Sequence, residues 1–218
     1  MILNIAIDGP AGAGKSTIAK ILAKKMNLVY LDTGAMYRGS AYYAIKRGVD
    51  VADEKAVLKI LPDLKMEIAY EDGAQKVIVC GEDVTPYIRE HNISMAASTI
   101  SKIPAMRLKL VELQREIAAS TPCVLDGRDI GSYVLPNAKY KIFLTADAKV
   151  RAMRRVKELN EKGVDISFEE VLKDIEARDY QDTHREFAPL VVAEGAILVD
   201  TSDLTIEQVA DKISEICK

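Results

Sequence analysis

The sequence predicts an α/β fold in which a five-stranded parallel sheet is flanked by helices. Short apolar runs, each long enough for a buried strand, alternate with segments that have the apolar spacing of an amphipathic helix. A glycine-rich loop joins the first apolar run, residues 2–7, to the first helical segment, residues 15–25. This repeated order of strand and helix is typical of parallel sheets, whose connections are helices.

Four further apolar runs complete the predicted sheet. They comprise residues 28–31, 123–125, 140–144 and 197–199. Helices are also expected at residues 35–46 and 104–118, and the second of these begins at Pro104, a residue favoured in a first helical turn.

Residues 49–103 interrupt the alternation and are predicted to form an inserted subdomain. Within them, residues 66–70 and 77–79 have the composition of short strands, and turns are expected at Asp72-Gly73 and Gly81-Glu82. The insert is therefore expected to contain a small antiparallel sheet.

The composition limits the partners and the compartment of the protein. A net charge of −3 does not suit a chain that neutralises a long run of phosphates, so no nucleic-acid polymer is expected as a partner. Three widely spaced cysteines, Cys80, Cys123 and Cys217, indicate a reducing compartment. No apolar stretch approaches the roughly 20 residues that span a bilayer. We therefore expect a cytoplasmic protein with no membrane partner.

The glycine-rich loop carries the strongest functional signal. Gly9-Pro10-Ala11-Gly12-Ala13-Gly14-Lys15-Ser16 fits GxxxxGK[ST], lies between a strand and a helix, and is followed by Thr17. This P-loop predicts a cradle of backbone N–H groups for ATP, with Lys15 on the β- and γ-phosphates and Ser16 on Mg²⁺. The alternative, a plain tight turn, would not require lysine and serine together after the last glycine. The fold class is therefore the P-loop NTPase fold.

A second motif, Leu31-Asp32-Thr33-Gly34-Ala35-Met36-Tyr37-Arg38, lies at a strand end, where ligands gather in open α/β sheets. Thr33 has two interpretations: an N-cap for the following helix, or a ligand of an anion at that helix end. Tyr37 and Arg38, one turn later, could reach back to the same anion.

A third motif, Asp126-Gly127-Arg128-Asp129-Ile130-Gly131, follows the apolar run 123–125. In the functional interpretation, Arg128 binds the phosphate of the acceptor, and Asp129 binds an amino group of a base. The alternative is a surface ion pair between Arg128 and Asp129 that contributes little to stability.

A fourth motif, Arg178-Asp179-Tyr180-Gln181-Asp182-Thr183-His184-Arg185, follows a helical segment that bears Arg151, Arg154 and Arg155. Arginines that arrive when a lid closes stabilise the charge of a phosphoryl group in transfer, so residues 149–167 are predicted to be a helical lid. A solvated helix face is the alternative for such a run of charges.

These four motifs, in this order, resemble those of the bacterial cytidylate kinase family. The resemblance covers nearly the whole chain and includes the insert 49–103, which distinguishes bacterial members from the shorter eukaryotic UMP/CMP kinases. It implies one P-loop kinase domain over residues 1–218, a nucleoside monophosphate kinase. The implied reaction transfers the γ-phosphoryl group of ATP to CMP or dCMP and gives ADP and CDP or dCDP.

The resemblance also implies roles for individual residues. The acceptor would be held by Thr33, Tyr37, Arg38, Ser98, Arg107, Arg128, Asp129, Arg178, Asp182 and Arg185. The catalytic set would be Lys15, Arg128, Arg154, Arg155, Arg178 and Arg185, with Arg151 as a further lid arginine. Either Asp32 or Asp126 would orient waters of Mg²⁺, and the sequence does not choose between them. A monomer is expected.

Three other functions are possible at this stage. A P-loop kinase could act on another acceptor, such as a different nucleotide or a shikimate-like acid. A switch GTPase would need a guanine-binding NKxD motif, and the sequence has none. A nucleic-acid binder is opposed by the acidic pI of about 5.6.

Overall fold

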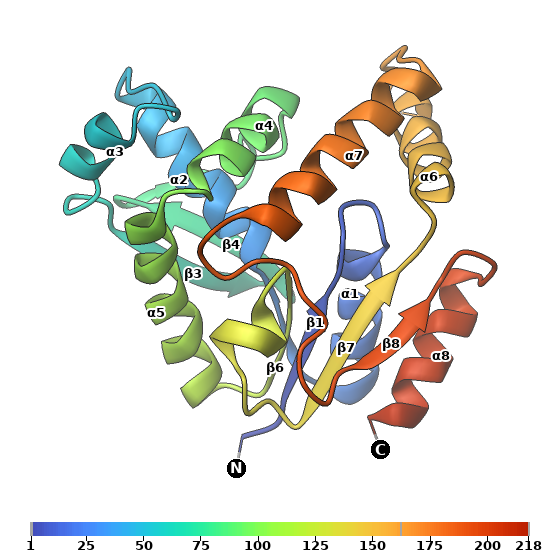
Figure 1. Cartoon of the computed structure of the whole chain (residues 1–218). Coiled ribbons are helices and arrows are strands. Elements are labelled where there is room, and N and C mark those ends of the chain that lie inside the picture. The colour runs from blue at the N-terminus through green and yellow to red at the C-terminus, as the bar shows by residue number, and fades with distance from the viewer. Residues whose placement is uncertain (1, 162, 218) are drawn as a thin grey trace. The chain divides into compact units, whose positions relative to one another are not determined.

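The computed structural model describes residues 2–161 and 163–217, which form two compact units (Figure 1). Unit 1 comprises Met1–Tyr30 and Pro122–Lys218, and unit 2 comprises Leu31–Thr121. The P-loop and the third and fourth motifs therefore belong to unit 1, and the whole of the second motif belongs to unit 2.

The main sheet has the strand order β2-β6-β1-β7-β8. Strand β1 (Asn4–Asp8) pairs in parallel with β6 (Cys123–Gly127) and β7 (Tyr140–Thr145), and β7 pairs in parallel with β8 (Ile197–Asp200). Strand β2 (Val29–Asp32) is the other edge. The predicted five-stranded parallel sheet is confirmed, and no strand end differs by more than two residues from the predicted apolar run.

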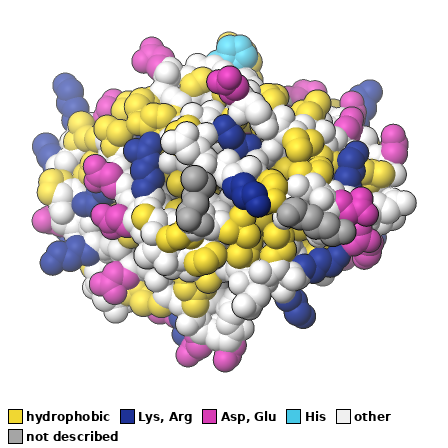
Figure 2. All heavy atoms as spheres, turned by 90° about the horizontal axis from the view of Figure 1, so that it is seen from below, with side chains coloured by type: hydrophobic (Ala, Val, Ile, Leu, Met, Phe, Trp, Pro, Cys, Tyr) yellow, Lys and Arg dark blue, Asp and Glu magenta, His cyan; other side chains and the backbone are white. Residues whose placement is uncertain are grey.

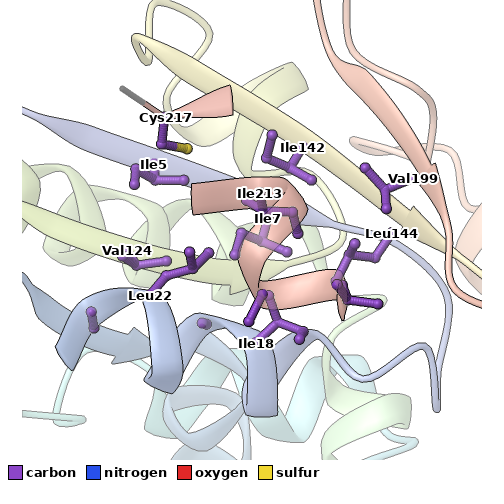
Figure 3. Close-up of a cluster of buried hydrophobic side chains, with 14 of the residues drawn as sticks. Ile5, Ile7, Ile18, Leu22, Val124, Ile142, Leu144, Val199, Ile213 and Cys217 are labelled. Atoms are coloured by element: carbon purple, nitrogen blue, oxygen red, sulfur yellow. The ribbon is translucent and has the colours of Figure 1, made fainter. Parts of the chain in front are cut away.

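Helices α1 (Lys15–Met26) and α8 (Ile206–Ile216) enclose the core of unit 1. Ile18 and Leu22 of α1 and Ile213 of α8 meet the sheet residues Ile5 and Ile7 in one buried cluster (Figure 3). Each of these side chains is at most 3% exposed. Burial of a side chain of this size contributes about 1.5–3 kcal/mol, so this cluster holds β1, and with it the start of the P-loop, in a fixed position.

Helices α6 (Ala148–Glu161) and α7 (Phe168–His184) run side by side (Figure 1). They share a small core of Ala152, Val171 and Ile175. A capping box between Ser167 and Glu170 starts α7 and satisfies N–H groups of its first turn. The predicted lid 149–167 corresponds to α6 and the connection to α7, except that residue 162 lies outside the described residues. Its movement stays a prediction.

Unit 2 contains a three-stranded antiparallel sheet, β3-β4-β5, as the composition of the insert predicted. Strands β3 (Met66–Glu71) and β4 (Ala74–Val79) are joined at Asp72 and Gly73, both with positive φ, which suits a tight hairpin turn. Strand β5 (Glu82–Asp83) was not predicted, because two residues carry no apolar pattern.

Four helices complete unit 2. They are α2 (Thr33–Lys46), α3 (Glu54–Ile60), α4 (His91–Ile100) and α5 (Pro104–Ser120). Helix α2 approaches the small sheet closely at Gly39, where an added Cβ would lie 2.9 Å from Cγ1 of Val77. The second motif is therefore packed directly against the insert.

The surface and the cysteines add three observations. On the face shown in Figure 2, acidic and basic side chains are interspersed rather than gathered by sign. Cys80, Cys123 and Cys217 are free thiols. Among the helices of the described residues, none is both long and apolar enough to cross a membrane.

Two glycines of the P-loop, one packed against backbone and one in open space, allow a test of the contact between Gly9 and Leu144. Gly9 has φ +147°, and an added Cβ would lie 1.9 Å from the carbonyl oxygen of Leu144, whereas a Cβ on Gly14, at φ +84°, meets nothing within 4 Å. We expect Gly9→Ala to lower the free energy of unfolding by about 3 kcal/mol or more, since backbone must shift. Gly14→Ala should cost only about 1–2 kcal/mol of backbone strain. Chemical denaturation without nucleotide would measure both, and equal losses would contradict the packing at Gly9.

Candidate active site

The P-loop presents backbone N–H groups at the start of α1. Gly9, Gly12 and Gly14 all have positive φ, which lets the chain turn sharply between β1 and α1. Gly14 precedes the helix in a left-handed conformation and has no side chain to cap the first turn. The N–H groups at this helix end are therefore suited to bind phosphate oxygens.

Lys15 is folded back over this loop. Its side chain is buried, and Nζ donates a 2.7 Å hydrogen bond to the carbonyl oxygen of Pro10. Burial, reinforced by the charge of Arg128, lowers the pKa of Lys15 to about 7. The ammonium group is thus held where an additional anion would stabilise its charge.

Ser16 contacts a carboxylate at the end of the neighbouring strand. Its Oγ donates a 2.8 Å hydrogen bond to Oδ2 of Asp126, and Tyr30 donates a 2.8 Å hydrogen bond to Oδ1. Asp126 is 5% exposed. Of the two carboxylates that the sequence could not separate, Asp126 contacts the P-loop serine. Asp32 belongs to unit 2, where it accepts hydrogen bonds from Arg38 and from the N–H of Ala35.

The third and fourth motifs meet in one network of ion pairs. Arg128 Nε lies 2.6 Å from Oδ2 of Asp182, and Arg185 Nη2 lies 3.2 Å from Oδ1 of Asp129. A longer contact of 3.8 Å joins Arg185 to Asp182. The alternative of a surface pair between Arg128 and Asp129 is wrong: each residue pairs with the other motif, and Asp129 is buried.

The charged neighbours of Arg128 and Arg178 shift the pKa of each arginine. Burial acts to lower the pKa of Arg128, but the carboxylates of Asp182 and Asp126 outweigh it and raise that pKa. Burial lowers the pKa of Arg178, and the charges of Arg155 and Arg128 act in the same direction. A phosphate dianion would therefore be stabilised here, because it would offset arginine charges that now repel one another.

The arginines of α6 occupy three different environments. Arg151 donates to the carbonyl oxygen of Ala11 in the P-loop at 2.9 Å and pairs with Asp179 at 2.7 Å. Arg154 instead donates to Oγ1 of Thr201, beyond β8, at 3.1 Å, and Arg155 pairs with Glu158 on the surface. The structure thus brings Arg151 to the P-loop, and it does not bring Arg154 or Arg155 there.

In unit 2 the second motif is arranged around Asp32. Its carboxylate caps α2 at Ala35 and accepts a 2.9 Å hydrogen bond from Arg38, so Asp32 is the N-cap. The expectation that Thr33 could be the cap is wrong, because Thr33 is the first residue of the helix. The side chain of Gln75, from β4, both accepts from the N–H of Asp32 at 2.7 Å and donates to its carbonyl oxygen at 3.2 Å.

The remaining predicted acceptor residues lie on α2, α4 and α5. The guanidinium of Arg107 lies 5.4 Å from the ring centroid of Tyr37 and donates to the carbonyl oxygen of Ser101 at 3.2 Å. Arg107 is only 1% exposed. Ser98 is half-buried near the end of α4, where its carbonyl oxygen accepts from Ser101. The turn between α4 and α5 therefore connects Ser98 with Arg107.

Comparison with known proteins identifies the family. Residues 5–218 match the cytidylate kinase family. The chain belongs to the cytidylate kinase family. A cytidylate kinase of Caldicellulosiruptor bescii is 49% identical over 214 residues, which cover 98% of this chain and 95% of that protein. One from Lactobacillus gasseri is 48% identical, with coverage of 99% and 94%.

The fold has a relative among solved structures. An uncharacterized protein from Eubacterium ventriosum has a TM-score of 0.52 at 15% identity, with 99% of this chain and 98% of that chain covered. This likeness concerns the fold alone.

Membership of the cytidylate kinase family confirms the predicted enzyme class, a nucleoside monophosphate kinase, and its function, phosphorylation of CMP or dCMP by ATP. The individual site residues stay predictions. Sequence reasoning missed three contacts: Tyr30 with Asp126, Gln75 with Asp32, and Asp8 with the backbone of the third motif. Tyr30, Gln75 and Asp8 lie outside the four motifs as defined above, so no spacing pattern pointed to them.

Proposed function

We propose that this cytidylate kinase binds ATP through residues 9–17 and transfers its γ-phosphoryl group directly to the phosphate of CMP or dCMP. One observation carries the assignment of residues. Lys15, the Ser16–Asp126 contact and the ion pair between Arg128 and Asp182 all lie around the carboxyl ends of β1 and β6, which are neighbouring strands. Ligands of open α/β sheets bind at such an edge.

The donor side is supported by the chemistry of the loop. Backbone N–H groups and Lys15 would bind the phosphates of ATP, and the carbonyl contact of Arg151 to Ala11 would keep the loop in place. The hydroxyl of Ser16 and the carboxylate of Asp126 are oxygen ligands of the kind that Mg²⁺ prefers, so they would hold this ion directly or through water. When bound, Mg²⁺ neutralises charge on the β- and γ-phosphates.

Acceptor-binding roles are proposed for residues of each unit taken by itself. In unit 1, Arg128, Arg178 and Arg185 would bind phosphate, Asp182 the sugar and Asp129 the base. Asp129 would accept a hydrogen bond from the exocyclic amine of cytosine, and uracil offers no donor at that position. In unit 2, the residues proposed to bind the acceptor are Thr33, Tyr37, Arg38, Ser98 and Arg107.

The transfer step needs no covalent enzyme intermediate. An oxygen of the CMP phosphate attacks the γ-phosphorus of ATP, the bond from that phosphorus to the β–γ bridging oxygen breaks, and ADP leaves with the electron pair. Arginine charge stabilises the moving phosphoryl group. Arg154 and Arg155 would contribute to this charge only after α6 moves, since Thr201 and Glu158 now bind them.

Replacement of Asp126 tests the metal assignment. Asp126→Asn should lower kcat by about 10²-fold and raise the Mg²⁺ concentration needed for half-maximal rate, because one oxygen ligand loses its charge. Asp203→Asn, at an exposed position of the same unit, is the control and should leave both values unchanged. An unaltered Mg²⁺ dependence in Asp126→Asn would contradict the assignment.

Binding of ATP should be accompanied by proton uptake. Because the pKa of Lys15 is about 7 without nucleotide, its amine is mostly neutral at pH 8, and the phosphates of ATP would raise that pKa and charge it. Net uptake of protons on ATP binding should therefore be measurable at pH 8 by calorimetry in buffers of different ionisation enthalpy. Lys15→Arg, whose charge is permanent, should bind ATP without this uptake; equal uptake in both proteins would contradict it.

We further infer that the enzyme is a cytoplasmic monomer that binds no nucleic-acid polymer. The net charge of −3, the three free cysteines and the interspersed charges in Figure 2 support this inference. Sedimentation at micromolar concentration, with and without duplex DNA, would test it.

A further inference from the structure

Asp8, the last residue of β1, is a buried carboxylate to which the mechanism above assigns no role. It is 3% exposed. Its Oδ1 accepts a 2.8 Å hydrogen bond from the N–H of Ile130, and its Oδ2 accepts a 2.7 Å hydrogen bond from the N–H of Gly131. Both donors begin the short π-helical turn Ile130–Val134, directly after Arg128 and Asp129. One side chain thus binds the backbone of the third motif directly after Arg128 and Asp129.

The same residue is joined to the P-loop by the chain itself. Asp8 is followed by Gly9, which is fixed against the backbone of Leu144, and Asp8 is paired with Gly127 in the parallel register of β1 and β6. The carboxylate therefore connects the loop that begins at Gly9 with the loop that carries Arg128 and Asp129. No other residue type of this size can accept from two N–H groups with a full negative charge.

The environment of Asp8 makes its charge costly. Burial raises the pKa of Asp8 to about 6, against the opposing effect of the N–H groups of Gly131 and Ile130. Among the charged neighbours, Asp129 raises this pKa and Lys15 lowers it. A neutral residue at this position would avoid the cost of burying a charge. The two hydrogen bonds to the N–H groups of Ile130 and Gly131 give a reason for a carboxylate at this position.

The position of Gly131 supports a close fit at this contact. An added Cβ on Gly131 would lie 3.3 Å from Oδ2 of Asp8 and 3.1 Å from Cδ of Lys141. Lys141 itself donates to the carbonyl oxygen of Pro136 at 2.7 Å, beyond the far end of the turn. The loop is therefore held at both ends, and its N-terminal end depends on Asp8.

We propose that Asp8 is a positioning residue for the acceptor nucleotide, which fixes the backbone of Ile130 and Gly131 and thereby the placement of Arg128 and Asp129. This inference rests on the proposed roles of those two residues. It predicts that a change at Asp8 affects binding of CMP far more than binding of ATP, because the carboxylate of Asp8 binds the backbone next to Asp129. A side chain with only a structural role would lower stability and leave the ratio of the two affinities unchanged.

The test compares Asp8→Asn with the wild-type enzyme by calorimetric titration of CMP and of ATP, and by steady-state kinetics. Asparagine keeps one acceptor and presents an amide NH₂ to the second N–H, so we expect Kd and KM for CMP to rise at least about tenfold, or about 1.4 kcal/mol. The corresponding values for ATP should change less than about twofold. Asp211→Asn, which breaks an exposed pair with Lys25, should change neither.

Each of the following outcomes either overturns the proposal or separates it from the proposed function. Equal losses for CMP and ATP, or no loss in a folded Asp8→Asn, overturn it. If Asp8→Asn does not fold, Gly131→Ala should show the same selective loss through crowding of Oδ2, and its absence overturns the proposal. The variants Asp129→Asn and Arg128→Lys separate this proposal from the proposed function. If they also leave CMP binding unchanged, the proposed acceptor site is wrong as well. If they weaken CMP binding while Asp8→Asn and Gly131→Ala do not, only the proposed role of Asp8 is wrong.

Discussion

Replacement of Lys15 by methionine is expected to lower kcat/KM by about 10³-fold or more, the range found when a preorganised charge is removed from a transition state. Methionine keeps most of the buried aliphatic volume of Lys15 and removes the ammonium group that lies over the P-loop. The loss should appear in kcat as well as in KM for ATP, because charge on the transferred group increases in the transition state. Steady-state kinetics with saturating CMP would measure it.

The control for this prediction is Lys24→Met, at an exposed position on the same helix. This variant should have the activity of the wild-type enzyme. Thermal unfolding should show both variants folded. A loss of less than about tenfold in a folded Lys15→Met would show that the ammonium group contributes little to phosphoryl transfer.

Replacement of Asp129 by alanine or asparagine is expected to lower kcat/KM for CMP by about 10²–10³-fold, with a much smaller effect on binding of ATP. The first reason is loss of the proposed hydrogen-bond acceptor for the cytosine amine, since a site built to bind a polar group discriminates strongly when that contact is lost. The second is that Arg185, with a side chain only 7% exposed, loses the nearer of two carboxylates, at 3.2 Å, and keeps the longer contact of 3.8 Å to Asp182. Breaking such a buried pair costs about 3–5 kcal/mol of stability.

Asparagine separates these two effects. Asp129→Asn keeps the shape of the side chain and an oxygen for Arg185, so it should be more stable than Asp129→Ala. It should also show relatively better use of UMP than the wild-type enzyme, because its amide NH₂ can donate to a carbonyl of uracil. Asp211→Asn is again the exposed control. Equal losses for CMP and ATP would contradict the assignment of Asp129 to the base.

Much of the fold could be predicted because buried parallel strands leave a continuous apolar signal. The apolar runs 2–7 and 140–144 were recognised in this way and correspond to β1 (Asn4–Asp8) and β7 (Tyr140–Thr145), and the P-loop marked the position of the first helix. The ends of strands and the two-residue β5 were missed, since polar residues such as Asp8 and Asp126 at a strand end resemble the start of a loop. The boundary of unit 2 at Leu31 follows from packing of α2 on the small sheet, which no local pattern encodes.

The residue types of the candidate site could be predicted, but their partners could not. The sequence indicated Arg128, Asp129, Asp182 and Arg185, and the structure adds that they pair across motifs that are more than fifty residues apart. The choice of Asp126 over Asp32 for contact with Ser16 likewise depends on the neighbouring register of β1 and β6. Such pairings are set by the order of strands in the sheet, which apolar periodicity alone does not determine.

The most direct test of the account is the rate of ADP release with CMP, dCMP, UMP, AMP, GMP and shikimate offered separately at equal concentration with ATP and Mg²⁺. The account predicts turnover confined mainly to CMP and dCMP, because Asp129 in its proposed role would need a donor on the base and Asp182 in its proposed role would accept ribose or deoxyribose. Turnover of UMP or another acceptor at a rate equal to that of CMP would contradict it.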